Sequence, residues 1–155
     1  MPLDARLADV LGLIDTLTNE FGGQADIFMI AKEMESDIDD LMPALNAAVN
    51  LGFVDVDNGD VKITNTGKEF LNAKISDRKR ILKQRLLNLE PFHTAYVLGL
   101  RKPFKINELI EELDKKGYAE AREPGIGHLL EILLAEWSVF AGILKRRDDE
   151  YISLP

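Results

Sequence analysis

The sequence predicts a mainly α-helical protein with small β-hairpins, organised as tandem winged helix-turn-helix modules joined by a helix. Three observations predict this fold class. Apolar residues recur at helical spacing along most of the 155 residues. Three such segments are followed by a short alternating stretch around Asn58-Gly59, a pair favoured in tight hairpins. The same order of elements then recurs, so we expect winged-helix module 1 at 1–73, a basic helical linker at 74–90 and winged-helix-like module 2 at 91–155.

Module 1 begins with three predicted helices. The first ends at Gly22-Gly23, and its apolar residues lie on one side: Leu7, Val10, Leu11, Ile14 and Leu17. A second, short helix is expected over 26–34. The third follows Ser36, a residue that favours the N-cap position, and ends at Gly52. Its expected buried stripe is Leu41, Leu45, Ala48 and Val49.

A β-hairpin and a short helix complete module 1. The alternating stretches 53–56 and 61–64 are separated by 57–60, which contains the Asn-Gly pair of a two-residue turn. Thr64 leads into the short helix. Three helices followed by a hairpin is the winged helix-turn-helix arrangement, in which the third helix recognises DNA and the hairpin is the wing.

The linker is rich in cations and is predicted to be helical. It contains neither Gly nor Pro between 74 and 85, and its apolar residues keep a helical rhythm. Asp77 stands among six cations, which are Lys74, Arg78, Lys79, Arg80, Lys83 and Arg85. This stretch is either a contact for an anionic partner or a solvated face that offsets the acidic first module.

Module 2 repeats the element order of module 1 with little similarity in residues. We expect a helix over 91–100, a short helix from Asn107, a third helix over 127–137 and a closing hairpin over 139–154 with its turn at 147–150. Phe92 and Tyr96 on the first of these helices are candidates for a partner surface, because small modules have little interior in which to bury aromatic residues. Packing in the core of module 2 is the alternative.

The charge distribution argues against nucleic-acid binding by module 1. The net charge is −8, but 1–73 carries −10 and 74–155 carries +2. No Lys or Arg occurs from 37 to 51, the helix that would enter a DNA groove, and the wing adds Asp55, Asp57 and Asp60. These carboxylates would repel phosphate groups. In module 2 the wing is basic at 145–147, which either touches phosphate or is a solvated turn.

No catalytic or metal-binding pattern is legible. The chain has no cysteine, which excludes a thiol nucleophile and cysteine-ligated metals. His93 and His128 are not spaced as metal ligands, and no phosphate-binding loop occurs. We therefore expect no enzymatic activity and no cofactor. No apolar stretch reaches the length of a membrane span and no signal peptide is recognisable, so we expect a cytoplasmic protein without direct membrane insertion.

Several stretches resemble the AAA-associated C-terminal domain family. They are 22–26, 30–34, 39–43, 51–54, 60–64 with Gly67, and 75–81 with its Asp77-Arg78-Lys79 pattern. In that family the domain usually follows the ATP-binding subunit of a nitrate, sulfonate or bicarbonate type ABC transporter. The resemblance implies a cytoplasmic accessory or regulatory module that contacts the ATPase or another copy of itself. It carries over no catalytic residue.

Together these observations predict a non-catalytic protein-interaction or regulatory module associated with an ABC-type transporter ATPase. Its partner is expected to be that ATPase subunit or a homodimer partner, and not nucleic acid. The candidate partner-binding residues are Arg78, Lys79, Arg80, Lys83, Arg85, Phe92 and Tyr96. The alternative is a winged-helix transcription regulator that binds DNA through module 2 and the basic linker.

Overall fold

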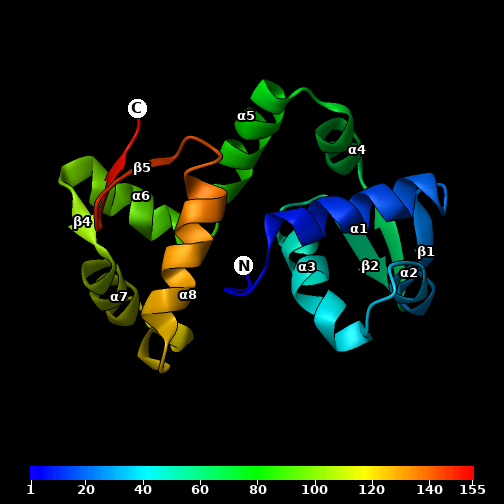
Figure 1. The fold of residues 1–155 in the computed structure, drawn as a ribbon, viewed down its shortest axis with the longest axis horizontal. Helices are drawn as coiled ribbons and strands as arrows, with labels where there is room; N and C mark the ends of the chain where they lie inside the picture. Colours follow the sequence, from blue (N-terminus) through cyan, green and yellow to red (C-terminus); the bar gives the residue numbers. More distant parts are fainter. The chain divides into compact units, whose positions relative to one another are not determined.

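The computed structural model describes all 155 residues and divides into two compact units, 1–81 and 82–155. Unit 1 holds two layers, with α1 (Leu7–Asn19) lying across one face of a small sheet (Figure 1). Its other elements are β1 (Gln24–Asp26), α2 (Ile27–Glu33), α3 (Ile38–Asn50), β2 (Val54–Asp57), β3 (Asp60–Ile63) and α4 (Asn65–Asn72). The boundary between the units falls within α5 (Ile75–Leu86), in the segment predicted to be a helical linker.

Two helices of unit 1, α2 and α4, begin at residues whose side chains cap them. Asp26 accepts a hydrogen bond from the backbone N–H of Phe28 at 2.8 Å, and Thr64 accepts one from Gly67 at 3.0 Å. The N-cap of α3 is Asp37, one residue after the predicted Ser36. The Ser36 hydroxyl instead donates to the Asp37 carbonyl at 3.1 Å, so the prediction was wrong by one residue.

The sheet of unit 1 has three strands in the order β1-β3-β2, all antiparallel. The predicted hairpin is confirmed: Asp57 pairs with Asp60, and Asn58 and Gly59 both have positive φ, 50° and 84°. Both residues of a primed two-residue turn require this conformation. The sequence prediction missed β1, because a strand of three residues is too short to show an alternating pattern.

The core of unit 1 combines the apolar sides of α1 and α3 with the inner face of the sheet. Val10, Leu13, Ile14 and Leu17 of α1 are fully buried. Phe53 and Phe70 stack with ring centroids 4.5 Å apart, which fixes α4 against the start of β2. Val49, predicted to be buried, is 40% exposed. It lies near the end of α3, on the side of the helix that faces solvent.

Unit 2 has the same order of strands in its own sheet. Its elements are α6 (Phe92–Arg101), β4 (Phe104–Lys105), α7 (Ile106–Lys115), a 3-10 turn (Ala119–Arg122), α8 (Ile126–Leu133), a π-helical turn (Leu134–Ser138), β5 (Leu144–Arg147) and β6 (Glu150–Ser153). The sheet order is β4-β6-β5. β4 was also missed, because it has two residues. Trp137 and Tyr151 are the largest side chains that are fully buried there.

The hairpins of the two units have the same register. Val54 pairs with Ile63 in unit 1, and Leu144 pairs with Ser153 in unit 2, each 90 positions later. Equivalent backbone bonds lead into each hairpin, because Gly52 donates to Val49 and Gly142 donates to Val139. Residue 54 therefore corresponds to residue 144 throughout the two hairpins.

The π-helical turn marks one inserted residue in unit 2. Before it, the buried residues Leu41 and Leu130 correspond with an offset of 89. After it, the hairpins correspond with an offset of 90. A π-turn is the local result of adding one residue within a helix, so the third helix of unit 2 keeps its buried side on both flanks of the insertion.

Candidate interaction surface

Exposed carboxylates occur on α3 and on the β2–β3 hairpin of unit 1, and we call these residues together the acidic face. Asp39 and Asp40 lie in the first turn of α3, and Asp55 and Asp57 lie on β2. All four are exposed. Lys62, the partner of Asp55 across the strands, is the basic residue on this hairpin. A surface with this charge repels phosphate and attracts basic groups.

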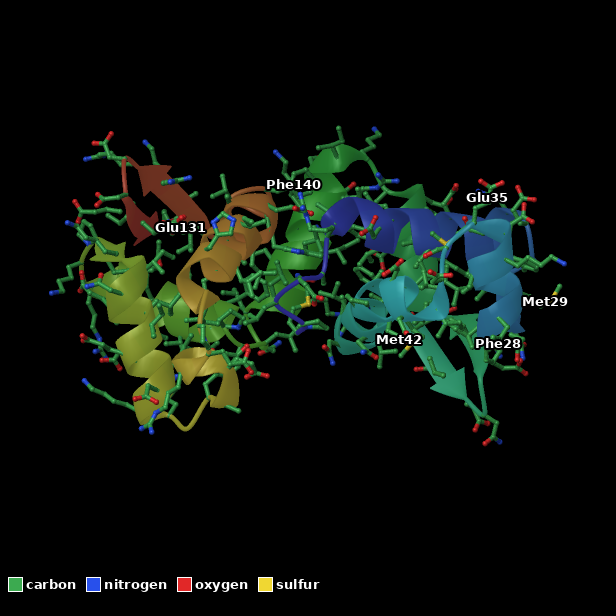
Figure 2. The ribbon with its side chains drawn as sticks, turned by 60° about the horizontal axis from the view of Figure 1, so that its bottom comes forward. Phe28, Met29, Glu35, Met42, Glu131 and Phe140 are labelled. Atoms are coloured by element: carbon green, nitrogen blue, oxygen red, sulfur yellow. The ribbon has the colours of Figure 1, made fainter.

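Apolar side chains are exposed on the same unit. Phe28 is 67% exposed and Met29 is 53% exposed at the start of α2, and both project outward from the helix (Figure 2). Val56 on β2 is 44% exposed. Large apolar groups exposed near one another are unusual on a protein without a partner, so they favour contact with another macromolecule.

The corresponding part of unit 2 is less acidic and has a basic strand. On the third helix His128 is exposed, while Glu131 is half-buried on α8 (Figure 2). On β5, Lys145, Arg146 and Arg147 are exposed. Arg146 is held locally, because its Nε donates to the Asp148 carbonyl at 3.0 Å and its guanidinium lies over the Tyr151 ring.

Among the basic residues of α5, Arg78 and Lys83 are half-buried, and Lys79, Arg80 and Arg85 are exposed. Arg78 is half-buried; its Nε donates to the Phe70 carbonyl at 3.0 Å and its Nη2 to the Leu71 carbonyl at 2.6 Å. These carbonyls are at the end of α4, where helices leave acceptors unsatisfied. Arg78 therefore has a structural role at the end of α4.

The other cations of α5 remain accessible. Lys79 and Arg85 are exposed. Arg80 forms an ion pair with Asp77 at 3.7 Å, with each side chain 54% exposed. Lys83 is half-buried, and its Nζ donates to the Pro155 carbonyl at 3.3 Å. An exposed ion pair of this length holds Arg80 weakly, so its charge can still meet a partner.

The two aromatic candidates on α6 are placed differently. Phe92 has no exposed surface and packs in the core of unit 2, so its side chain is not accessible to a partner in this fold. Its position on the inner side of the first helix explains the burial. Tyr96 is half-buried, and its backbone carbonyl accepts a hydrogen bond from the Ser153 hydroxyl at 2.6 Å.

A polar network on unit 2 was not visible in the sequence. The Glu90 carboxylate accepts hydrogen bonds from the backbone N–H of Thr94 at 2.9 Å and from its hydroxyl, and it lies 3.4 Å from Lys116 Nζ. Burial raises the pKa of Glu90, but the Thr94 hydrogen bonds and the Lys116 charge outweigh this effect and hold the pKa below its usual value. The network joins the start of α6 to the end of α7, which are 26 residues apart at their contact.

The two histidines lie on the surface of unit 2. Both are exposed, and His93 Nδ1 lies 3.2 Å from the Leu87 carbonyl. The structure contains no group of three or more histidine or carboxylate side chains arranged to hold a metal ion. Its helices are also too short, or too polar, to cross a membrane.

The comparisons with known proteins gave one match. A search of curated proteins and a search of solved structures each found none. The family model for the C-terminal AAA-associated domain matches residues 28–147, from the start of α2 to the end of β5, and so covers most of both units. The chain therefore belongs to the C-terminal AAA-associated domain family.

Proposed function

We propose that this chain is a non-catalytic, cytoplasmic, tandem winged-helix module that binds and regulates the ATPase subunit of an ABC-type transporter, of the class that imports nitrate, sulfonate or bicarbonate. The observation that carries the proposal is the family match over 28–147, since the family is described as a C-terminal domain associated with AAA proteins. The match indicates an ATPase partner in general terms, and the role and the transporter type are our proposal.

The repeated topology supports the winged-helix part of the proposal. Each unit runs helix, strand, helix, helix, strand, strand, and each sheet places its last strand in the centre. This is the order expected of a winged helix-turn-helix, with α3 and α8 in the position of the recognition helix.

The charge of unit 1 supports a protein partner. A DNA reader needs Arg, Lys, Asn or Gln on the exposed side of its recognition helix and cations on its wing. The acidic face has Asp39 and Asp40 in the first turn of α3, which is the end of the helix that would approach the DNA groove. It also has Asp55 and Asp57 on the wing. Four carboxylates at these positions oppose binding to a polyanion and suit a partner with basic groups.

The exposed cations of α5 are the contact that we assign to the ATPase. Lys79 and Arg80 lie one residue apart on the solvent side of the helix, next to the exposed Ile75, which is 64% exposed. An apolar side chain beside flexible cations is typical of the rim of a protein interface. Arg85 extends the charge along the same helix.

The test is co-elution with a purified ATPase subunit of such a transporter, together with its rate of ATP hydrolysis. We expect a complex that changes the hydrolysis rate, and weaker binding for Lys79→Glu/Arg80→Glu. The matched control is Lys32→Glu/Lys68→Glu, which makes the same change in charge at exposed positions of α2 and α4. Absence of a complex with every ATPase of this class would refute the proposal.

A second candidate function is DNA binding by unit 2 and α5, and the exposed Lys145, Arg146 and Arg147 on β5 favour it. Titration with duplex DNA at low salt separates the two functions. Under this alternative the affinity falls steeply as salt rises and is lost in Lys145→Glu/Arg147→Glu. If the chain does not bind duplex DNA at low salt, the alternative is excluded.

A further inference from the structure

The outer strands β2 and β5 have equivalent positions in their units and opposite charges, while the turn after β5 and the start of β6 add Asp148, Asp149 and Glu150 to the second hairpin. The register equates Asp55 with Lys145 and Asp57 with Arg147. All four side chains are exposed. Because neighbouring residues of a strand point to opposite faces, and Val54 and Leu144 are buried, these charged side chains lie on the solvent side of each sheet.

A third equivalent position also reverses its charge. On the first strand of unit 1, Asp26 pairs with Asp60; on the first strand of unit 2, Lys105 pairs with Glu150. The reversal therefore continues across the sheet from β2 to β1 and from β5 to β4. The central strand does not follow it, since Asp60 and Glu150 are both acidic.

Each unit also exposes a valine five residues before its charged strand. Val49 is 40% exposed and Val139 is 39% exposed. The backbone carbonyl of each valine accepts a hydrogen bond from the glycine that leads into the hairpin, which is Gly52 in unit 1 and Gly142 in unit 2. β2 and β5 are also the outer strands of their sheets. Each unit thus presents an edge strand, a row of like charges and one apolar side chain at equivalent places.

We propose that these two surfaces bind each other between molecules: the β2–β3 hairpin of one copy contacts the β5–β6 hairpin of a second copy. Asp55 and Asp57 of one copy then face Lys145 and Arg147 of the other. Both pairs are spaced two residues along a strand, roughly 7 Å, so the charges match in interval as well as in sign.

A second copy is the occupant because the complementarity is between two parts of the same sequence with the same backbone geometry. Nucleic acid matches the basic strand β5 and is repelled by the acidic strand β2. A second copy satisfies both, and the apolar Val49 and Val139 give it surface to bury. This contact does not use α5, which is the surface assigned above to the ATPase.

The experiment is sedimentation velocity of the full chain without any ATPase, at about 0.05 M and about 0.5 M salt, where the Debye length falls from roughly 14 Å to roughly 4 Å. We expect concentration-dependent self-association at low salt that weakens strongly at high salt. A chain that stays monomeric at low salt over the accessible concentrations overturns the proposal.

Charge reversal identifies the surface. Asp55→Lys/Asp57→Lys makes both outer strands, β2 and β5, basic, and Lys145→Asp/Arg147→Asp makes both of them acidic, so each variant alone should associate at least about tenfold more weakly. An equimolar mixture of the two variants should associate again. Association that persists in each single variant, or a mixture that stays monomeric, contradicts the pairing.

The control is Glu20→Lys/Glu69→Lys, which makes the same change in net charge as the first variant at two exposed positions, one directly after α1 and one in α4. It should associate like the unaltered chain, and loss of association in this control would mean that net charge alone is responsible. Because no ATPase is present, a negative result here leaves the ATPase proposal to its own test.

Discussion

Replacing Arg78 should destabilise unit 1, although this residue stands in a basic stretch that invites a binding role. Its guanidinium makes two hydrogen bonds to the last carbonyls of α4, at 3.0 and 2.6 Å, and lies 5.7 Å from the centre of the Phe70 ring. Phe70 in turn stacks on Phe53 at the start of the hairpin. The side chain therefore ties α5 to α4 and α4 to the core.

The size of the effect follows from these contacts. A hydrogen bond from a charged donor contributes about 1.5 to 3 kcal/mol when buried, and a cation over an aromatic ring contributes about 0.5 to 1 kcal/mol at an exposed site. Because Arg78 is half-buried, the lower ends apply to most of these terms. We expect Arg78→Ala to lower the free energy of unfolding by about 2 to 3 kcal/mol. Arg78→Lys should lose about half of this, because an ammonium group cannot reach both carbonyls in a fixed fork.

The assay is urea unfolding followed by far-UV circular dichroism and by tryptophan fluorescence. Trp137 is the chain's one tryptophan and is buried in unit 2, so its fluorescence reports on that unit, while circular dichroism reports on the helices of both. The dichroism midpoint should fall in Arg78→Ala. Lys79→Ala, on the same helix, should change the stability by less than about 0.5 kcal/mol.

The reasoning fails if Arg78→Ala unfolds at the same urea concentration as the unaltered chain by both signals. It also fails if Arg78→Ala is as stable as the unaltered chain but no longer binds the ATPase subunit, because Arg78 would then act in binding. If the dichroism and fluorescence midpoints fall by the same amount in Arg78→Ala, the result agrees with a structural role for Arg78 and means that the two units unfold together.

Three further predictions concern single positions. Gly99→Ala should destabilise unit 2 by several kcal/mol, because the new Cβ would lie 2.7 Å from the Ser153 backbone nitrogen. Thermal unfolding followed by Trp137 fluorescence measures this loss, and a melting temperature equal to that of the unaltered chain would contradict the prediction. Thr64→Val should cost about 1 to 2 kcal/mol in urea unfolding, because the hydroxyl both accepts from Gly67 and donates to the Gly52 carbonyl at 2.6 Å, whereas Thr64→Ser should be close to neutral. Burial and the charges of Glu120, Glu90 and Glu123 raise the pKa of Tyr118 to about 12 from 10.0. The neutral side chain therefore stabilises the fold below pH 10, and this stabilisation is lost as the pH rises toward 12. Tyr118→Phe should flatten the fall in stability between pH 10 and pH 12, and an equally steep fall would contradict the assignment.

Much of the helical architecture was readable from the sequence because long amphipathic segments show their periodicity locally. The helices over 7–19, 38–50 and 92–101 all follow apolar spacing that the residues display by themselves. The Asn58-Gly59 turn was also readable, because few residue pairs tolerate positive φ at both positions. The strands β1 and β4 were not, since their two or three residues are strands only by pairing with a segment far along the chain.

Individual side-chain roles depended on the environment more than on residue type. Arg78 and Lys79 are neighbours in one basic stretch, yet Arg78 caps α4 and Lys79 is exposed. Phe92 and Tyr96 are one helical turn apart, and Phe92 is fully buried while Tyr96 is partly accessible. Which cation meets a carbonyl and which aromatic faces the core is decided by elements that pack from elsewhere in the chain.

By itself the sequence determined the mainly helical class, the excess of acid on the first half and the family resemblance that the family match bears out, because these are properties of composition and local spacing. The tertiary structure alone decided which charges share a surface. The opposition of Asp55 and Asp57 to Lys145 and Arg147 appears only when strand register equates residue 54 with residue 144, and register is set by pairing across the sheet.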